Sequence, residues 1–465
     1  MNHRYDAIVI GAGQAGPSLA ARFAGAGKSV AIIERKFFGG TCVNAGCTPT
    51  KTLIASARIA YDARRAHSYG IELPTASVTV DMRAVQARKK QVVDASRNGL
   101  ENWLRGLRNC AVYEGHARFE SARSVSVDGK TLTAEQIFIN VGGRPRSPAF
   151  PGIDRVAFLT STSLLELEEL PRHLLIIGGS YVGLEFAQMF RRFGSDVTVI
   201  EKESRLLSHE DPEVAVEIKA ALEAEGIQIR LEAECIELSH DAESVTANVH
   251  CSVGSPQVTG SHVLIAVGRT PNTGDLGLEK AGVDTDQAGF IKVDDELRTN
   301  VSGIWALGDC NGKGAFTHTA YNDYEIVAAN LFGGNPRRRL SDRIPCYALF
   351  VDPPLGRVGL TEHDALAQGH AIRIGSRPMT RVARAVEKGE TRGLMKIVVD
   401  ARSNLILGAS ILGVGADEAI HSIIDVMAAG VPYTTLQNTV HIHPTVSELI
   451  PTVLGELGPS TGMSV

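Results

Sequence analysis

The chain of 465 residues is 44% hydrophobic and 21% charged, which suits two to four globular domains with substantial apolar cores. Its formal net charge of −5 argues against nucleic acid or a membrane surface as a partner. We expect no membrane span and no secretory signal, because the chain runs from Met1 directly into a short apolar strand. The scattered cysteines do not form the framework of a secreted protein, so we predict a cytoplasmic location.

The first segment of the chain is typical of a dinucleotide-binding unit. An apolar strand over residues 7–10 runs into a glycine-rich turn, and a helix follows. Gly11, Gly13 and Gly16 permit a tight turn, a close approach of a pyrophosphate and close packing of the helix on the strand. A second strand ends in Glu34, about 20 residues further on, where a carboxylate can accept hydrogen bonds from a ribose.

Cys42 and Cys47 follow this unit and indicate a redox-active disulfide stacked against a flavin. A disulfide requires Cα atoms about 4.4–6.8 Å apart, and a regular helix would turn residues at this spacing onto divergent faces. We therefore expect the pair at the distorted first turn of a helix, a place that suits Gly46 and Pro49. The N-terminal end of a helix also favours a thiolate. The alternative is a structural or accidental pair of cysteines.

A second unit of the same kind begins near residue 174. Its turn carries Gly178, Ser180 and Gly183, and its second strand ends in Glu201 at the same spacing as in the first unit. The small side chain of Ser180 stands where the first unit has its middle glycine. Two dinucleotide sites imply two dinucleotides, so we predict FAD beside the cysteines and NAD(P)H at the second site. The alternative is an ordinary βαβ unit.

The charges at the end of the second unit affect the choice of nicotinamide cofactor. Glu201 would repel a 2′-phosphate, and it therefore favours NADH. Lys202 and Arg205 follow it and offer a phosphate a counter-charge, which leaves NADPH as the alternative.

Later segments complete the flavin-binding part. The chain leaves for the second unit after a strand over residues 136–141 and returns after a strand that begins at Val263. A further short strand ends in an acid that can accept hydrogen bonds from flavin hydroxyls. A helix that opens near Phe316 is expected to point its positive end at the flavin. The cofactor-binding residues predicted in these segments and beside the cysteines are Thr41, Gly142, Gly268, Arg269, Asp309, Thr317 and His318.

From about residue 340 the sequence alternates between strands and two helices, as in an α+β domain. Near its end, Glu448 follows His443 and is placed to fix the tautomer of that histidine and raise its basicity. A histidine in a loop before a helix is more often an ordinary surface residue. Dithiol chemistry needs a proton acceptor, however, which favours a catalytic histidine in this chain.

These motifs together resemble the pyridine nucleotide–disulfide oxidoreductase family, in the branch of mercuric reductase, dihydrolipoamide dehydrogenase and glutathione reductase. The resemblance covers essentially the whole chain and is most specific over residues 40–47 and 443–448. It implies an α/β fold with two Rossmann-like FAD- and NAD(P)-binding domains and a C-terminal α+β dimerisation domain. The expected boundaries are 1–148 and 271–339 for the FAD-binding domain, 149–270 for the NAD(P)-binding domain and 340–465 for the dimerisation domain.

The resemblance also implies roles for the cysteines and for the histidine pair. Cys42 would be the interchange thiol that meets the substrate, and Cys47 the thiol that faces the flavin. The chain would form a homodimer in which His443 and Glu448 reach the disulfide of the other subunit.

Three further residues match the family by position. Lys51 and Glu185 match a buried ion pair near the flavin N5 atom, and Asp309 matches the flavin-binding acid. The implied reaction moves a hydride from NAD(P)H to FAD, and electrons then pass to the cysteine pair. The pair exchanges them with a small dithiol or disulfide substrate.

The sequence leaves the electron acceptor open. The cysteine segment resembles mercuric reductase most, and a metal-ion reductase that captures a soft ion such as Hg²⁺ or Cu²⁺ is one alternative. The chain ends without the vicinal cysteines of mercuric reductases, and it keeps the His–Glu pair of the dithiol enzymes. A dihydrolipoamide dehydrogenase subunit of a larger complex is the other alternative. We predict no resident metal ion.

Overall fold

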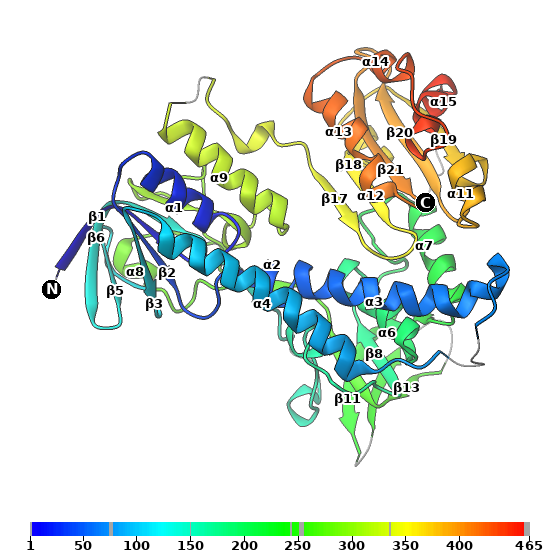
Figure 1. Ribbon diagram of the computed structural model, residues 1–465, viewed down its shortest axis with the longest axis horizontal. Helices are drawn as coiled ribbons and strands as arrows, with labels where there is room; N and C mark the ends of the chain where they lie inside the picture. The colour runs from blue at the N-terminus through cyan, green and yellow to red at the C-terminus, as the bar shows by residue number, and fades with distance from the viewer. Residues whose placement is uncertain are drawn as a thin grey trace.

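A computed structural model describes residues 2–73, 78–148, 150–241, 244–250, 255–333 and 336–459. Three bodies are visible in Figure 1: one around β1 on the left, one around β8 below, and one around β20 at the upper right. Two long helices, α3 (Cys47–Arg65) and α4 (Met82–Gly106), pack against each other across the junction of these bodies.

The first body is built on a parallel sheet in the order β3-β2-β1-β6, with β16 paired to β6 and an antiparallel extension through β5 and β4. Residues 7–10 of β1 are fully or almost fully buried, because helices cover both faces of a parallel sheet. Helices α1 and α9 pack against each other beside this sheet. The strands are β1 (Asn2–Ile10), β2 (Val30–Glu34), β3 (Cys110–Glu114), β4 (Arg118–Ser121), β5 (Ser124–Val127), β6 (Lys130–Ile139) and β16 (Ile304–Ala306), and the helices are α1 (Gly16–Gly25), α2 (Gly40–Ala45), α8 (Leu278–Ala281) and α9 (Thr317–Leu331).

The second body repeats the plan on a smaller scale, with a parallel sheet in the order β10-β9-β8-β14 and a separate antiparallel sheet β11-β12-β13. Helix α6 packs against β8 and β9 on one side and α3 on the other, so most of its residues are buried. The elements are β8 (His173–Ile177), β9 (Asp196–Ile200), β10 (Gln228–Arg230), β11 (Glu234–His240), β12 (Val245–His250), β13 (Gln257–Gly260), β14 (His262–Ile265), α5 (Ser161–Leu164), α6 (Tyr181–Phe193) and α7 (Pro212–Ala224).

The two connections between these bodies lie side by side. The chain leaves the first body through β7 (Gly143–Pro145) and returns through β15 (Arg269–Pro271), and these two strands pair antiparallel. This pairing brings the residues next to β7 and the residues next to β15 together between the first and the second body.

The third body is a six-stranded sheet in the order β17-β18-β21-β20-β19-β22, in which every pairing is antiparallel. The prediction of two helices in this region was wrong, because its described part holds several short helices whose few residues give no readable helical period. The elements are β17 (Cys346–Leu349), β18 (Leu355–Gly359), β19 (Ile372–Pro378), β20 (Leu394–Asp400), β21 (Ile406–Leu412), β22 (Gly458–Pro459), α10 (Glu362–Ala367), α11 (Ala383–Glu387), α12 (Ala416–Ala419), α13 (His421–Ala428), α14 (Thr434–Gln437) and α15 (Ile450–Gly455).

Buried charges join the third body to the second. Lys396 on β20 is 2% exposed and pairs with Asp211 of the second body at 3.4 Å, and Glu362 of the third body also binds it at 2.7 Å. Glu210 accepts a hydrogen bond from the hydroxyl of Tyr347 on β17. Buried ions of opposite sign are costly to separate, so these contacts hold the two bodies in one relative position.

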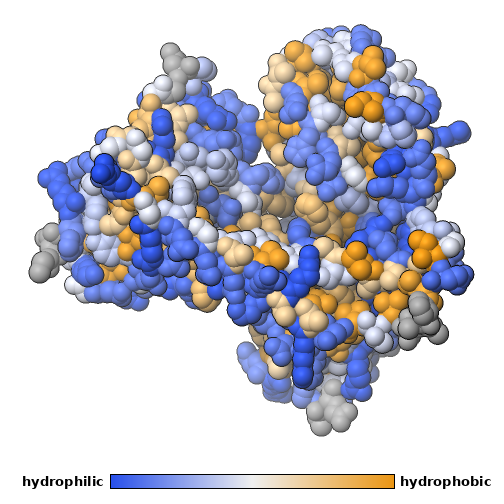
Figure 2. Space-filling view, in the orientation of Figure 1, coloured by the Kyte–Doolittle hydropathy of each residue, from blue (hydrophilic) through white to orange (hydrophobic). Residues whose placement is uncertain are grey.

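Apolar surface is also present outside the cores. Figure 2 shows apolar residues gathered on the third body at the upper right, and a hollow between it and the first body. Val440 and Ile442 are 95% and 80% exposed, which marks the segment around them as a surface that another molecule can cover. No helix among the described residues has both the length and the apolar character that a membrane crossing requires.

Candidate active site

The two cysteines lie on either side of a break between two helices. Cys42 lies within α2, Cys47 begins α3, and Gly46 between them has φ −139° and ψ −121°. A Cβ atom on Gly46 would lie 2.8 Å from the carbonyl oxygen of Thr41, so a larger residue would push the helices apart. The sequence predicted a single distorted helix start; the structure instead has two helices that meet at a glycine.

Hydrogen bonds and charge make the two thiols unequal. Both are free thiols, and their side chains hydrogen bond to each other. This bond lowers the pKa of Cys47, with help from the Thr317 hydroxyl and the Lys51 ammonium, while burial opposes the shift. The same bond, together with burial, raises the pKa of Cys42. In the dithiol form the negative charge therefore resides on Cys47.

Lys51 and Glu185 form the predicted ion pair. The Lys51 Nζ atom lies 2.8 Å and 3.0 Å from the two carboxylate oxygens of Glu185, which is 5% exposed. Lys51 stands one helical turn after Cys47 on α3, and Glu185 is on α6. The pair therefore connects the cysteine helix to the second body next to the thiol that carries charge.

The first glycine-rich turn packs backbone against backbone. Gly11 has φ +102°, and a Cβ there would lie 2.2 Å from the carbonyl oxygen of Asn140. A Cβ on Gly16 would lie 2.2 Å from the Gly11 oxygen, and Gly13 approaches Gly40 at the start of α2. The Glu34 carboxylate accepts a hydrogen bond from the turn at 2.9 Å. The turn is thus held in a tight shape at the N-terminal end of α1, where the helix dipole favours a phosphate.

Asn140 supports this turn and was not predicted from the sequence. Its side-chain oxygen accepts from the Gly16 N–H at 3.1 Å, and its amide nitrogen donates to the Leu307 carbonyl at 2.9 Å. A polar residue at the carboxyl end of an otherwise apolar strand was the available signal.

The surroundings of the turn fit a flavin dinucleotide. Gly142 and Gly268 have φ values of +63° and +113°, and a Cβ on either would meet only open space within 4 Å. Asp309 faces this region with its carboxylate 3.4 Å from the Arg269 Nε atom, and burial raises its pKa. FAD could be held with its diphosphate on the turn at Gly11 and its flavin near Asp309 and the cysteines.

Two of the three remaining predicted cofactor residues lie at the same place. The Thr317 hydroxyl is 3.5 Å from the Cys47 sulfur at the start of α9, and the Thr41 hydroxyl donates to the Gly143 carbonyl at 3.5 Å. His318 turns toward the third body, where its Nε2 atom is 2.7 Å from the carbonyl oxygen of Cys346. The first two border the thiols, and the third contacts β17.

The second glycine-rich turn has the same backbone packing. A Cβ on Gly178 would lie 2.5 Å from the Ala266 oxygen, and one on Gly183 would lie 2.0 Å from the Gly178 oxygen. The Glu201 carboxylate accepts from the Gly179 N–H at 2.5 Å. Ser180 adopts an extended conformation at the N-cap of α6 without capping it by its side chain. These residues fit a second dinucleotide.

The neighbouring cations are engaged elsewhere. Lys202 pairs with Glu203 at 3.0 Å, and Arg205 donates to the carbonyl of Ser208 at 2.9 Å.

His443 and Glu448 form a hydrogen bond but lie at the surface. His443 Nδ1 is 2.8 Å from Glu448 Oε2, and the histidine side chain is 73% exposed. Among the contacts of the described residues, none joins this pair to Cys42 or Cys47 of the same chain. The structure thus brings the other predicted catalytic residues together and leaves this pair apart, beside the exposed Val440 and Ile442.

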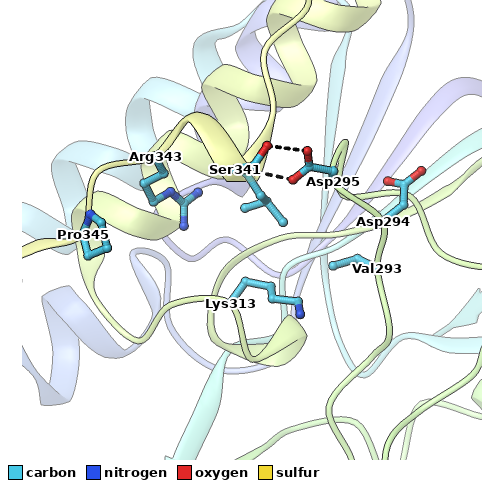
Figure 3. Close-up of a pocket in the computed structure, with 8 residues that line it drawn as sticks. Val293, Asp294, Asp295, Lys313, Ser341, Arg343 and Pro345 are labelled. Carbon is cyan, nitrogen blue, oxygen red and sulfur yellow. Dashed lines mark hydrogen bonds between the residues drawn. The ribbon is translucent and has the colours of Figure 1, made fainter. Parts of the chain in front are cut away.

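A separate cavity of about 350 Å³ lies where the first and third bodies are linked (Figure 3). Asp295 accepts hydrogen bonds from the N–H and hydroxyl of Ser341 at 2.8 Å and 2.6 Å, and Arg343 pairs with Asp323. None of the predicted site residues lines it; the lining residues are Val293, Asp294, Asp295, Lys313, Leu340, Ser341, Arg343 and Pro345.

Taken together, two dinucleotide turns, a thiol pair and a lysine paired with a buried glutamate define a flavin- and nicotinamide-dependent oxidoreductase. The family model described as "Pyridine nucleotide-disulphide oxidoreductase" matches residues 5–323, and that of its dimerisation domain matches residues 346–454. The chain belongs to this family and is an enzyme of it. The predicted family, the α/β fold class with its C-terminal dimerisation domain and the enzyme class are confirmed.

Curated relatives have several names. The chain is 38% identical over 453 residues to RclA of Escherichia coli strain K12, covering 96% of this chain and 98% of RclA. It is 33% identical to the mercuric reductase of Bacillus cereus, covering 96% and 70% of the two chains. It is 34% identical to the dihydrolipoyl dehydrogenase of Thermus scotoductus, covering 96% and 95%.

A solved structure is similar throughout. The Cu(II) complex of RclA from Escherichia coli, described as an HOCl-induced flavoprotein disulfide reductase, aligns with a TM-score of 0.88 at 37% identity, covering 97% of this chain and 99% of that one. The protein is therefore a pyridine nucleotide–disulfide oxidoreductase of a family that uses FAD and NAD(P)H, and its dimerisation domain implies a homodimer.

Proposed function

We propose that this enzyme uses NADH to reduce a small disulfide, or runs in reverse on a dithiol, through the Cys42–Cys47 pair. The observation that carries the proposal is the Cys47 sulfur, held next to Thr317 and close to Lys51 with its charge stabilised. FAD, when bound, supplies the chemistry that converts hydride transfer into reduction of the cysteine pair.

The two thiols divide the exchange with substrate. Cys42 gives its proton to a base and attacks one sulfur of the substrate disulfide; a mixed disulfide forms and the other substrate sulfur leaves as a thiolate. Cys47 then attacks the Cys42 sulfur, which forms the Cys42–Cys47 disulfide and releases the second substrate thiolate. Both substrate sulfurs end as thiols once they are protonated, so the two electrons held by the cysteines pass to the substrate.

His443 of the partner subunit is proposed as the base. Glu448 accepts from His443 Nδ1 at 2.8 Å, which leaves Nε2 free to take the Cys42 proton and return it to a leaving thiolate. The high exposure of the His443 side chain in one chain supports a role that is completed only in the dimer.

The cofactor is proposed to be NADH rather than NADPH. Glu201 is fixed by the Gly179 N–H and can accept from a ribose diol, while it would repel a phosphate. The engagement of Lys202 with Glu203 and of Arg205 with Ser208 supports this choice. A cytoplasmic location stays a prediction.

Reduction of a soft metal ion is a second candidate. Two adjacent sulfurs, one with a lowered pKa that favours its thiolate, form a soft ligand pair. Relatives include proteins named mercuric reductase, and RclA has been solved as a Cu(II) complex. No cluster of three or more histidine, cysteine or acidic side chains that could hold a metal ion occurs among the described residues.

A screen of acceptors tests the proposal. The purified FAD-loaded enzyme is given NADH with lipoamide, glutathione disulfide, Hg²⁺ or Cu²⁺, and oxidation of NADH is followed. We expect a disulfide to be turned over and Cys42→Ser to abolish that turnover. Turnover of metal ions alone would contradict the proposal that the substrate is a disulfide, and it would favour reduction of a soft metal ion. Co-purification with an acyltransferase core, together with high activity on lipoamide, would identify the chain as a dihydrolipoamide dehydrogenase subunit.

A further inference from the structure

The connection between β17 and β18 reaches from the third body to the ion pair beside the thiols. Figure 1 shows β17 descending from the third body toward α3. Phe350, immediately after β17, makes two contacts there. Its backbone N–H donates to Glu185 Oε1 at 3.0 Å, and its ring centroid lies 4.6 Å from Lys51 Nζ.

These contacts act on both ends of the ion pair. An ammonium over an aromatic face is attracted by the ring quadrupole, and the attraction strengthens when water is excluded. Lys51 has 33% of its side chain exposed and a flexible stem, so the ring restricts a charge that could otherwise move into solvent. The N–H fixes the carboxylate that the ammonium binds.

The connection itself is held by other residues. The side chain of Gln188 and the backbone of Asp352 exchange two hydrogen bonds of 2.7 Å. The Asp352 carboxylate pairs with Arg192 at 2.7 Å and also with Arg58 on α3. Loss of the Phe350 ring would therefore leave its backbone in place, and the N–H bond to Glu185 with it.

We propose that Phe350 is a positioning residue that holds the Lys51 ammonium where its charge stabilises the Cys47 thiolate. This inference rests on the proposed function, because it assumes that Cys47 is the thiol facing the flavin. It also means that the dimerisation domain contributes a side chain to the redox centre of its own chain.

The electrostatics around Cys47 give the direction of the effect. Cys42 on α2 and Thr317 on α9 hydrogen bond to it, Lys51 on α3 lowers its pKa, and Glu185 on α6 raises it. Tyr181 on α6 also faces Cys47. Without the ring, the Lys51 ammonium should stabilise the Cys47 thiolate less, while the repulsion from the Glu185 carboxylate remains. The thiolate should therefore become harder to form.

The experiment uses FAD-loaded Cys42→Ser protein, in which the Cys47 thiolate beside oxidised flavin should give a long-wavelength absorbance band. The pH midpoint of this band reports ionisation of Cys47. In this background we expect Phe350→Leu to raise the midpoint by about half a pH unit, and Phe350→Tyr to leave it unchanged. Phe332→Leu is the matched control, because it removes a ring 4.9 Å from the Arg22 guanidinium, a contact that does not involve the Lys51–Glu185 pair.

Each outcome has one meaning. An unchanged midpoint in Phe350→Leu overturns the inference while the proposed function stands. Absence of the band in Cys42→Ser with Phe350 intact contradicts the proposed function itself. If Phe350→Leu fails to bind FAD, Phe350→Met fills more of the space and should show the same rise. Failure of both to bind FAD would assign the ring to folding and also overturn the inference.

Discussion

The segment around Cys42 and Cys47 and the segment around His443 differ in how far one chain completes them. The cysteines lie between α2 and α3, and Thr317, Lys51 and Glu185 surround Cys47. His443 has one partner, Glu448, and 73% of its side chain is exposed. The cysteine segment is therefore assembled within one chain, whereas the side chain proposed as the base, His443, points outward. We therefore expect that the dimer is needed for exchange of electrons with substrate but not for reduction of the flavin by NADH.

The largest effect is expected from the cysteines. Cys42→Ser or Cys47→Ser should lower turnover of a disulfide by on the order of 10⁴-fold or more, because a covalent nucleophile is removed. Flavin reduction by NADH, followed by stopped-flow absorbance, should persist. The long-wavelength band should be absent in Cys47→Ser and present without reductant in Cys42→Ser. Wild-type behaviour of both variants would mean that the pair is not redox-active.

The next largest effect separates the two segments. His443→Gln should reduce disulfide turnover by about 10²–10⁴-fold, the usual contribution of a positioned base, and leave reduction of the flavin nearly intact. His441→Gln is the matched control, since the ring of His441 hydrogen bonds to the backbone carbonyl of Thr439 at 3.0 Å, a contact that does not involve Glu448. Full disulfide turnover by His443→Gln would contradict the dithiol mechanism and favour metal ions as acceptors.

A smaller effect concerns the choice of the nicotinamide cofactor that supplies electrons to the cysteine pair. We expect kcat/KM to be about a hundredfold higher with NADH than with NADPH, since a desolvated like-charge contact costs a few kcal/mol. Glu201→Gln should narrow this ratio. Glu223→Gln, which removes a surface carboxylate paired with Lys219 at 2.7 Å on α7, should not. A preference for NADPH in the wild type would mean that Lys202 or Arg205 turns toward the phosphate.

The smallest effect concerns the joint between the second body and the domain that carries His443. Burial raises the pKa of Glu210 to about 7, above its usual value. The stability that protonated Glu210 contributes to the fold is therefore fully present below the usual pKa of a glutamate, and it is lost as pH rises through about 7. The glutamine in Glu210→Gln cannot ionise. The free energy of unfolding of this variant, relative to that of the wild type, should therefore rise by about 1–3 kcal/mol between pH 5 and pH 8. Denaturant unfolding at both pH values measures this; a difference that stays constant with pH would mean that Glu210 is ionised throughout.

The sequence by itself determined the parts whose chemistry depends on local spacing. Two glycine turns, each with an acid at the end of the next strand, required the backbone approaches that the structure has at Gly11 and Gly178. The spacing of Cys42 and Cys47 required a break in regular helix, and Gly46 provides it. These features are predictable because a few neighbouring residues decide the backbone conformation.

Only the tertiary structure decided which distant side chains meet. Asn140 reaches the first turn, and Phe350 reaches Lys51, from segments far along the chain. Sequence periodicity did not resolve the short helices of the third body, because each spans too few residues to show a period. It also could not show that Lys202 and Arg205 are engaged by Glu203 and Ser208. Such contacts depend on how sheets and helices pack, and packing joins residues that no local pattern relates.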